Sequence, residues 1–260
     1  MVSGLPDLDL GAWLGHYLWP LSRMGGFLMS MPVLGSRVVP IRIRMALSIM
    51  FTVVAMPFIQ DVPRCDPLGL LCWLVVVEQI LIGLAMGFCL QVLFQVFEIS
   101  GQLVATQSGL GFSSMVDPST GVSVASISQM YSMLVTLLFL ALDGHLVLIE
   151  FAVRSFKVLP IQVGLELPVR WSVLFQGGSW MFASALLVSL PALVALLVVN
   201  LALAVITRAA PQLNIFSIGF PITLLVGLLI VWLSLDQVPD QWHDLSMQAY
   251  DRLQHVLGVP

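Results

Sequence analysis

The sequence predicts an all-α protein built from membrane-associated helical hairpins. Three observations support this fold class: 59% of the 260 residues are hydrophobic, only 9% are charged, and the apolar residues gather in runs long enough to cross a bilayer as helices. Soluble domains carry about 25% charged residues. We therefore expect most of the chain to lie in or against a membrane.

Six apolar runs predict five or six helices, each ending where proline, glycine or charge appears. The third run is about 30 residues long, which as a helix spans roughly 45 Å and exceeds a hydrocarbon core of about 30 Å. That helix has to tilt, bend or leave the bilayer. The runs cover residues 10–31, 43–60, 68–97, 124–150, 177–206 and 213–235.

The charge balance argues against nucleic acid as a partner. Ten Lys and Arg residues against 14 Asp and Glu residues give a net charge of −4, so no basic stripe can follow a phosphate backbone. The first ten residues are acidic and do not have the pattern of a secretory signal. We expect the membrane segments themselves to direct insertion.

The third run contains Gly83 and Gly87, which lie four positions apart. Glycines at this spacing share one helix face and allow another backbone to approach closely, although the motif is common by chance in glycine-rich membrane helices. We predict that this face packs against another helix or a neighbouring subunit.

Ionisable residues interrupt the apolar runs and allow two interpretations. A charge facing lipid at a helix centre costs about 2.5–3.5 kcal/mol, so such residues face protein or a water-filled passage. They form either a proton pathway or polar contacts between packed helices. We favour contacts at breaks between helices, because an Asp-Gly-His tripeptide interrupts the fourth run and an arginine lies close to a proline. The residues are Glu78, Asp143, His145, Glu150 and Arg208, the last of these near Pro211.

Motifs of known catalytic sites are absent from the sequence. It contains no His-Glu-x-x-His zinc site, no Gly-x-Ser-x-Gly nucleophile turn and no Gly-x-x-x-x-Gly-Lys phosphate loop. We therefore expect no enzymatic activity, no metal and no cofactor.

Residues 107–121, QSGLGFSSMVDPSTG, form a stretch rich in glycine and serine between two apolar runs. The glycines permit varied backbone angles, the serines can satisfy exposed backbone groups, and the apolar residues among them can exclude water, so the composition suits a movable seal. From the residues alone, a passive connector between helices is the simpler interpretation. The apolar residues are Leu110, Phe112, Met115 and Val116.

From Asp236 onward, acidic residues alternate with apolar ones, which predicts a short amphipathic helix outside the core. Its acidic polar face fits anionic lipid poorly. A partner helix or simple solvation is the favoured environment for residues 236–260.

Residues 208–222, RAAPQLNIFSIGFPI, resemble the signature of the flagellar biosynthesis protein FliR family and its injectisome relatives. Other matches follow in order along the chain, so the resemblance covers nearly all of it. They are Arg23 with Met31-Pro32-Val33-Leu34-Gly35, Val39-Pro40-Ile41-Arg42, Glu78 with Gly83 and Gly87, and Asp143-Gly144-His145.

The resemblance implies a subunit of the type III secretion export gate, in the flagellar basal body of the bacterial inner membrane. The implied partners are FliP-like and FliQ-like subunits, FlhB-like and FlhA-like export proteins, membrane lipid, and the unfolded flagellar proteins that pass through the pore. It implies one membrane-embedded export-gate domain, residues 1–235, followed by the tail 236–260. Within that domain, residues 1–175 are FliP-like, with an irregular plug loop at 106–122, and residues 176–235 form a FliQ-like hairpin.

In the family this loop projects into the central passage and helps to close it before export, so the resemblance favours a plug over a connector. The implied plug residues are Gly109, Leu110, Gly111, Phe112, Ser113, Ser114, Met115, Val116, Asp117, Pro118 and Ser119. The residues expected at helix or subunit contacts are Gly83, Gly87, Glu78, Asp143, His145, Arg208 and Pro211.

A rival function is a proton-coupled transporter of small solutes, with a relay through Glu78, Asp143, His145 and Glu150. Inverted repeats of matching helices favour such a transporter. The two halves of the sequence differ in length and in the positions of glycine and proline, so they do not support this function.

Overall fold

The computed structural model describes residues 10–36, 38–59, 69–112, 114–116, 123–162, 169–210 and 215–258. Within these ranges the chain forms eight α-helices, three short 3-10 helices and two three-residue strands, which confirms the all-α prediction. The chain divides into two compact units. The first unit holds Met1–Gln91, Asp143–Phe175 and Tyr250–Pro260, and the second holds Val92–Leu142 and Gln176–Ala249.

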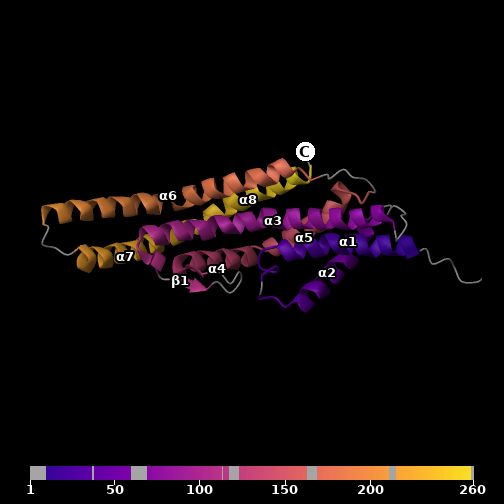
Figure 1. Ribbon diagram of the computed structural model, residues 1–260, viewed down its shortest axis with the longest axis horizontal. Coiled ribbons are helices and arrows are strands. Elements are labelled where there is room, and N and C mark those ends of the chain that lie inside the picture. Colours follow the sequence, from indigo (N-terminus) through magenta and orange to yellow (C-terminus); the bar gives the residue numbers. More distant parts are fainter. Residues whose placement is uncertain are drawn as a thin grey trace, which may run out of the picture. The chain divides into compact units, whose positions relative to one another are not determined.

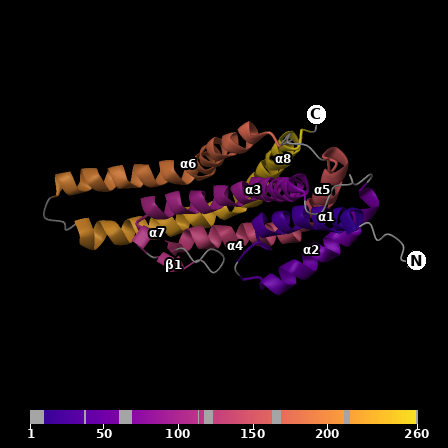
Figure 2. The same ribbon diagram turned by 45° about the vertical axis from the view of Figure 1, so that its right-hand side comes forward.

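The first unit begins with an antiparallel pair of helices, α1 and α2 (Figures 1 and 2). The connection between them is held by Arg44, whose Nη2 donates hydrogen bonds to the carbonyl oxygens of Ser36 at 2.7 Å and Val39 at 2.9 Å. Pro40 directly precedes α2 in an extended conformation, which suits a helix start because the residue needs no helical donor there. The unit also contains α5, the first part of α3, the beginning of α6 and the end of α8. The bounds are α1 Leu10–Ser30, α2 Ile41–Ala55, η1 Met56–Phe58, α3 Leu70–Gln107, α5 Gly144–Val158, α6 Trp171–Ala209 and α8 Val238–Val256.

The core of the first unit depends on one face of α1. Met24, Phe27, Leu28 and Met31 follow each other at spacings of three, one and three residues, and each is at most 2% exposed. This spacing places the four side chains on one side of a helix with 3.6 residues per turn. The face contacts α3, which is described with the functional residues below.

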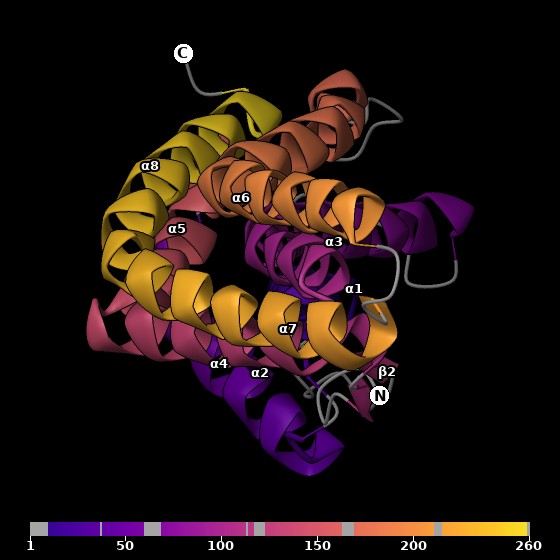
Figure 3. The same ribbon diagram turned by 90° about the vertical axis from the view of Figure 1, so that its left-hand side faces the viewer.

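The second unit contains the rest of α3, the loop that follows it, α4, most of α6, α7 and most of α8. The helices α6 and α7 run in opposite directions (Figures 1 and 2), and Figure 3 shows α7 crossing the view below α6. The bounds of the remaining elements are η2 Leu110–Phe112, β1 Ser114–Val116, β2 Ser123–Ala125, α4 Ser126–Ala141, α7 Ile215–Ser234 and η3 Leu235–Gln237.

Trp242 of α8 belongs to an aromatic core in the second unit. Its ring centroid lies 5.4 Å from that of Phe94, 5.8 Å from that of Phe97 and 6.4 Å from that of Phe139. The predicted amphipathic helix therefore exists, but the expectation that it lies outside the core is wrong. Trp242 lies on the apolar face of α8 and packs among these phenylalanines, so that only 3% of the Trp242 surface is exposed.

Among the described residues, four helical segments are long and apolar enough to cross a membrane, and α4 with α5 would count together as a fifth, broken span. The third predicted run corresponds to α3, which runs for 38 residues, or about 57 Å. It exceeds the predicted run because polar residues such as Glu98, Ser100 and Gln102 end the apolar stretch without ending the helix. The four segments are Ile41–Phe58, Leu70–Gln107, Trp171–Ala209 and Gly219–Val256.

Candidate functional site

The loop between α3 and α4 contains a small β-hairpin. Strand β1 pairs with β2 in antiparallel register, with Ser114 opposite Ala125, Met115 opposite Val124 and Val116 opposite Ser123. Figure 2 shows β1 beside the start of α4. The loop is thus less irregular than the sequence predicts, because strands of three residues are too short to leave an alternating pattern that sequence reasoning can recognise.

The second stem of this loop is fixed to α3 by hydrogen bonds. The Oε1 atom of Gln102 accepts a hydrogen bond from the backbone N of Ala125 at 3.2 Å, and Ser128 Oγ donates to the carbonyl oxygen of Glu98 at 2.6 Å. Gly101 allows this close approach, because an added Cβ atom would lie 2.7 Å from Cα of Ser128. The end of the hairpin and the start of α4 are therefore held against the last turns of α3.

The predicted plug residues fall into three groups. Gly109, Leu110 and Gly111 are fully described, with Gly109 in the left-handed region at φ 78°. For Phe112, Ser114, Met115 and Val116 the structure describes the backbone. Outside the described residues lie Ser113, Asp117, Pro118 and Ser119, and so does Pro211 of the predicted contact residues.

Gly83 of α3 lies directly against the backbone of α1 in the first unit. A Cβ atom at Gly83 would collide with the carbonyl oxygen of Arg23 and would lie 2.7 Å from the backbone N of Phe27. The contact is reciprocal, because a Cβ atom at Gly26 of α1 would lie 2.7 Å from the carbonyl oxygen of Ile80.

Gly87 continues the same contact one turn later. A Cβ atom there would lie 2.8 Å from the carbonyl carbon of Ser30 and 2.9 Å from the backbone N of Met31, and would also collide with the Ser30 hydroxyl. The two glycines thus meet a helix of their own chain. Contact between them and a neighbouring subunit stays a prediction.

Arg23 is fully buried and connects three helices of the first unit. Its Nε donates to Gln79 Oε1 of α3 at 2.7 Å, its Nη1 to the carbonyl oxygen of Ser155 at 3.0 Å, and its Nη2 to the carbonyl oxygen of Leu159 at 2.9 Å. The guanidinium carbon lies 4.3 Å from the ring centroid of Phe156. Because these carbonyl groups belong to the last turn of α5 and its cap, the cation also interacts favourably with the negative end of that helix dipole.

The sequence prediction of contact residues does not include Arg23. The sequence could have indicated that Arg23 is a contact residue, since an arginine within an apolar run faces protein by default. Its acceptors were not visible, because Ser155 and Leu159 are 132 and 136 positions away along the chain. Glu78, which the prediction does include, is half-buried beside Gln79 and is the charged neighbour of Arg23.

The other ionisable residues lie at helix ends or on exposed faces, and His145 is half-buried in the first turn of α5. Asp143 stands between α4 and α5 with φ 53° and begins α5, as expected of a break between helices. Glu150 forms an exposed ion pair with Arg154 at 2.6 Å. Arg208 is exposed in the last turn of α6. In the described ranges, no three His, Cys, Asp or Glu side chains gather in a group that could hold a metal ion.

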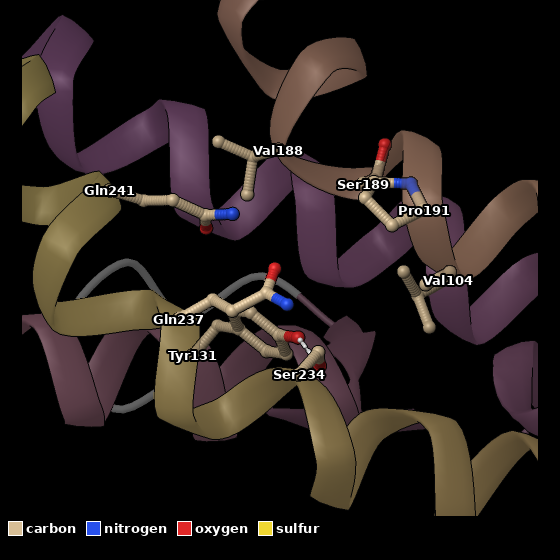
Figure 4. A pocket seen from close by; sticks show the side chains of 9 residues that line it. Val104, Tyr131, Val188, Ser189, Pro191, Ser234, Gln237 and Gln241 are labelled. Atoms are coloured by element: carbon tan, nitrogen blue, oxygen red, sulfur yellow. Dashed lines mark hydrogen bonds between the residues drawn. The ribbon is translucent and has the colours of Figure 1, made fainter.

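A small cavity in the second unit is lined by hydroxyl and amide side chains together with apolar ones (Figure 4). Its volume is about 10 Å³, close to the space of one water molecule. Pockets for small organic ligands measure about 300–1,000 Å³, so this cavity is too small to bind a solute. The polar residues around it are Tyr131, Ser189, Ser234, Gln237 and Gln241.

Comparison with known proteins identifies the family. The family model described as bacterial export proteins, family 1, matches residues 14–249. The flagellar biosynthetic protein FliR of Pectobacterium carotovorum subsp. carotovorum is 33% identical over 251 residues, which cover 96% of this chain and 95% of that protein. FliR of Escherichia coli strain K12 is 39% identical over 219 residues, covering 84% and 83%. The surface presentation of antigens protein SpaR of Shigella flexneri is 26% identical over 156 residues, or 60% of each chain. The chain therefore belongs to family 1 of the bacterial export proteins, the family of the flagellar biosynthetic protein FliR.

Proposed function

We propose that this chain is a structural, pore-forming subunit of the flagellar type III export gate. Membership of the FliR family makes it a component of a bacterial flagellar export apparatus in the inner membrane. The finer proposal is that it assembles with FliP-like and FliQ-like subunits, meets FlhB-like and FlhA-like proteins, and forms part of the passage for unfolded flagellar proteins. The observation that carries this proposal is the match over nearly the whole chain.

Exposed apolar helices support a role inside a larger assembly. In the most apolar 18-residue window of α6 only 17% of the residues are buried, against 61% in α3. Large apolar side chains are exposed along the length of α6, so lipid or partner subunits have to cover them. They include Phe182, Leu187, Val194, Leu197, Leu201 and Val205.

The antiparallel pair of α6 and α7 supports the proposed division of the chain. In this division residues 1–175 correspond to a FliP-like part and residues 176–235 to a FliQ-like hairpin. A hairpin that exposes apolar residues over much of its surface suits contact with neighbouring subunits, because large exposed apolar patches mark sites of protein or membrane contact.

The loop between α3 and α4 is the proposed seal. It leaves α3 at a left-handed glycine, its second stem is hydrogen-bonded to α3, and it carries four apolar residues. A short tethered hairpin can present such residues across a passage, and an apolar constriction excludes water and ions. These features support closure of the resting pore by this loop.

The rival proton-coupled transporter receives no support from the described residues. Glu150 is exposed and paired with Arg154, Asp143 begins a helix, and the polar cavity is too small for a solute. A relay needs ionisable groups close enough to pass a proton through side chains or water. The export-gate subunit is therefore the function that we propose.

Co-expression with FliP-like and FliQ-like subunits tests the proposal. The chain is expected to co-purify with both in mild detergent and to aggregate or be degraded when expressed alone, since an obligate subunit depends on its partners for stability. A monodisperse, thermally stable monomer that fails to bind either partner would overturn the proposal.

A further inference from the structure

Three residues of α7 face the two stems of the loop between α3 and α4. Phe220, Gly227 and Ser234 follow at steps of seven residues, which is close to two helical turns, so they lie along one side of the helix. We call these three residues the α7 seam. Each has a contact with the loop stems within the second unit.

The middle residue of the α7 seam meets the first stem. Gly227 is buried, and a Cβ atom there would collide with Cβ of Ser108, the residue that directly follows α3. Ser108 is itself fully buried, and its Oγ donates to the carbonyl oxygen of Ala105 at 3.1 Å. The backbone of α7 therefore lies against the first residue of the loop, with no room for a further methyl group.

The first residue of the α7 seam covers the next position of the loop. Gly109 has φ 78°, a conformation that other residues adopt only with strain. A Cβ atom at Gly109 would lie 3.1 Å from Cε2 of Phe220. The ring of Phe220 thus lies over the glycine at which the chain turns out of α3.

The last residue of the α7 seam meets the second stem. Ser234 Oγ and the hydroxyl of Tyr131 are 3.0 Å apart, and Figure 4 shows this hydrogen bond beside the polar cavity. Tyr131 lies in the second turn of α4, after the hairpin, and is 4% exposed. One side of α7 therefore contacts the chain both before and after the loop.

We propose that the α7 seam is a clamp that holds both stems of the loop, so that displacement of α7 releases the loop. The contacts of the clamp are a property of the fold. Its consequence, the opening of the seal, rests on the proposed function. The second stem is also held by the hydrogen bonds that Gln102 accepts from Ala125 and that Ser128 donates to Glu98, and the first stem is paired with it through β1 and β2. Movement of the FliQ-like hairpin would in this way set the position of the plug.

The direct test introduces a reporter cysteine, Ser114→Cys, into the hairpin and measures its reaction rate with a maleimide dye in the purified, assembled gate. Parent gate without this substitution gives the background from the native cysteines. Gly227→Ala is expected to push Ser108 away and to raise the labelling rate about fivefold, as loss of roughly 1 kcal/mol of local stability would. Adding Ser108→Gly to Gly227→Ala removes the colliding side chain and is expected to restore the parent rate.

The matched control is Gly178→Ala in α6, where an added Cβ atom meets nothing within 4 Å, and it should leave the rate unchanged. If Gly227→Ala is not recovered in the gate, Tyr131→Phe serves instead, since it keeps the ring and removes only the hydrogen bond to Ser234; a rise of about threefold is expected. Parent-like labelling in the recovered variant would overturn the clamp, as would a rise in Gly227→Ala that Ser108→Gly fails to reverse.

Failure of the clamp and failure of the seal give different results. The labelling rate reports the clamp whether or not the loop closes a pore. Ion leakage through the assembled gate reports the seal. Two results together would keep the clamp and reject the plug. One is the expected change in labelling rate in the reporter variants, and the other is the absence of ion leakage in a separate gate whose loop has been replaced.

Discussion

Arg23 donates a hydrogen bond from Nη2 to the carbonyl oxygen of Leu159 at 2.9 Å, so a side chain of α1 completes the end of α5. A buried cation without a carboxylate bound to it is unusual, because its lost hydration has to be replaced by other groups. Here the replacement comes from carbonyl oxygens, the Gln79 amide and the ring of Phe156. The position should therefore tolerate few substitutions.

Arg23→Met is expected to destabilise the chain by about 3 kcal/mol or more, because Gln79 Oε1 and the carbonyl oxygen of Leu159 would lose the donor that Arg23 supplies. Arg23→Lys keeps the charge but offers a point charge in place of a planar fork, and should recover only part of the stability. Thermal unfolding of the assembled gate in detergent measures both. Equal melting temperatures for Arg23→Met and the parent would show that the buried network contributes little.

Replacement of Gly83 and Gly87 by alanine is expected to separate α1 from α3 and to cost about 1–3 kcal/mol at each position, because the added methyl groups collide with backbone. Membrane insertion should remain normal, since the helix becomes slightly more apolar. Gly25→Ala is the control, because its Cβ atom meets nothing within 4 Å. Recovery of the full complex from the double variant at parent levels would exclude these glycines as essential contacts.

Replacement of residues 110–124 by a glycine-serine linker of equal length is expected to leave assembly intact and to make the membrane leak ions. The double change Phe112→Ser and Met115→Ser should give a weaker leak, since polar side chains allow water into an apolar constriction. Conductance, or uptake of a small impermeant solute by cells with an idle gate, measures the effect. Unchanged permeability at normal complex levels would mean that the loop is only a connector.

Trp242→Ala is expected to destabilise the second unit by about 3–5 kcal/mol, because it empties the space among three phenylalanines. Trp232→Ala provides the comparison, since Trp232 is 66% exposed on α7 and should change the melting temperature little. Equal effects of the two substitutions would contradict the burial of Trp242.

Glu150→Gln is expected to leave motility and protein export unchanged. Its partner Arg154 is exposed, and surface ion pairs contribute only about 0–1 kcal/mol. A swarming assay measures the result. Loss of export with normal complex levels would revive a proton-relay role for this residue.

The sequence predicts features that depend on neighbouring residues and misses those that depend on contacts between distant ones. Apolar runs predicted the helices because hydropathy and helix ends depend on neighbouring residues. They misplaced the end of α3 and the environment of Trp242, because a polar residue can continue a helix and an acidic helix can still bury one face. The glycine spacing predicted a close helix contact without naming α1 as its partner.

Some features of the candidate site could be predicted from the sequence and others could not. Gly109 could be expected at a turn from its residue type alone. The acceptors of Arg23, the anchoring of Ala125 by Gln102 and the contact of Gly227 with Ser108 all join positions more than 20 residues apart. No local pattern encodes such pairs, so the structure was needed to find them.

The first unit takes residues from both ends of the chain, and this has a consequence for biosynthesis. The backbone N of Arg170 donates to the carbonyl oxygen of Val256, and Leu253, Val256 and Leu257 are buried there. A ribosome adds about 5–20 residues per second, so the segment up to Gln91 waits roughly 10–30 s before these residues are made. The half-built unit exposes apolar surface throughout that interval. Insertion factors that shield it, and prompt synthesis of the partner subunits, should therefore decide the yield of the folded chain.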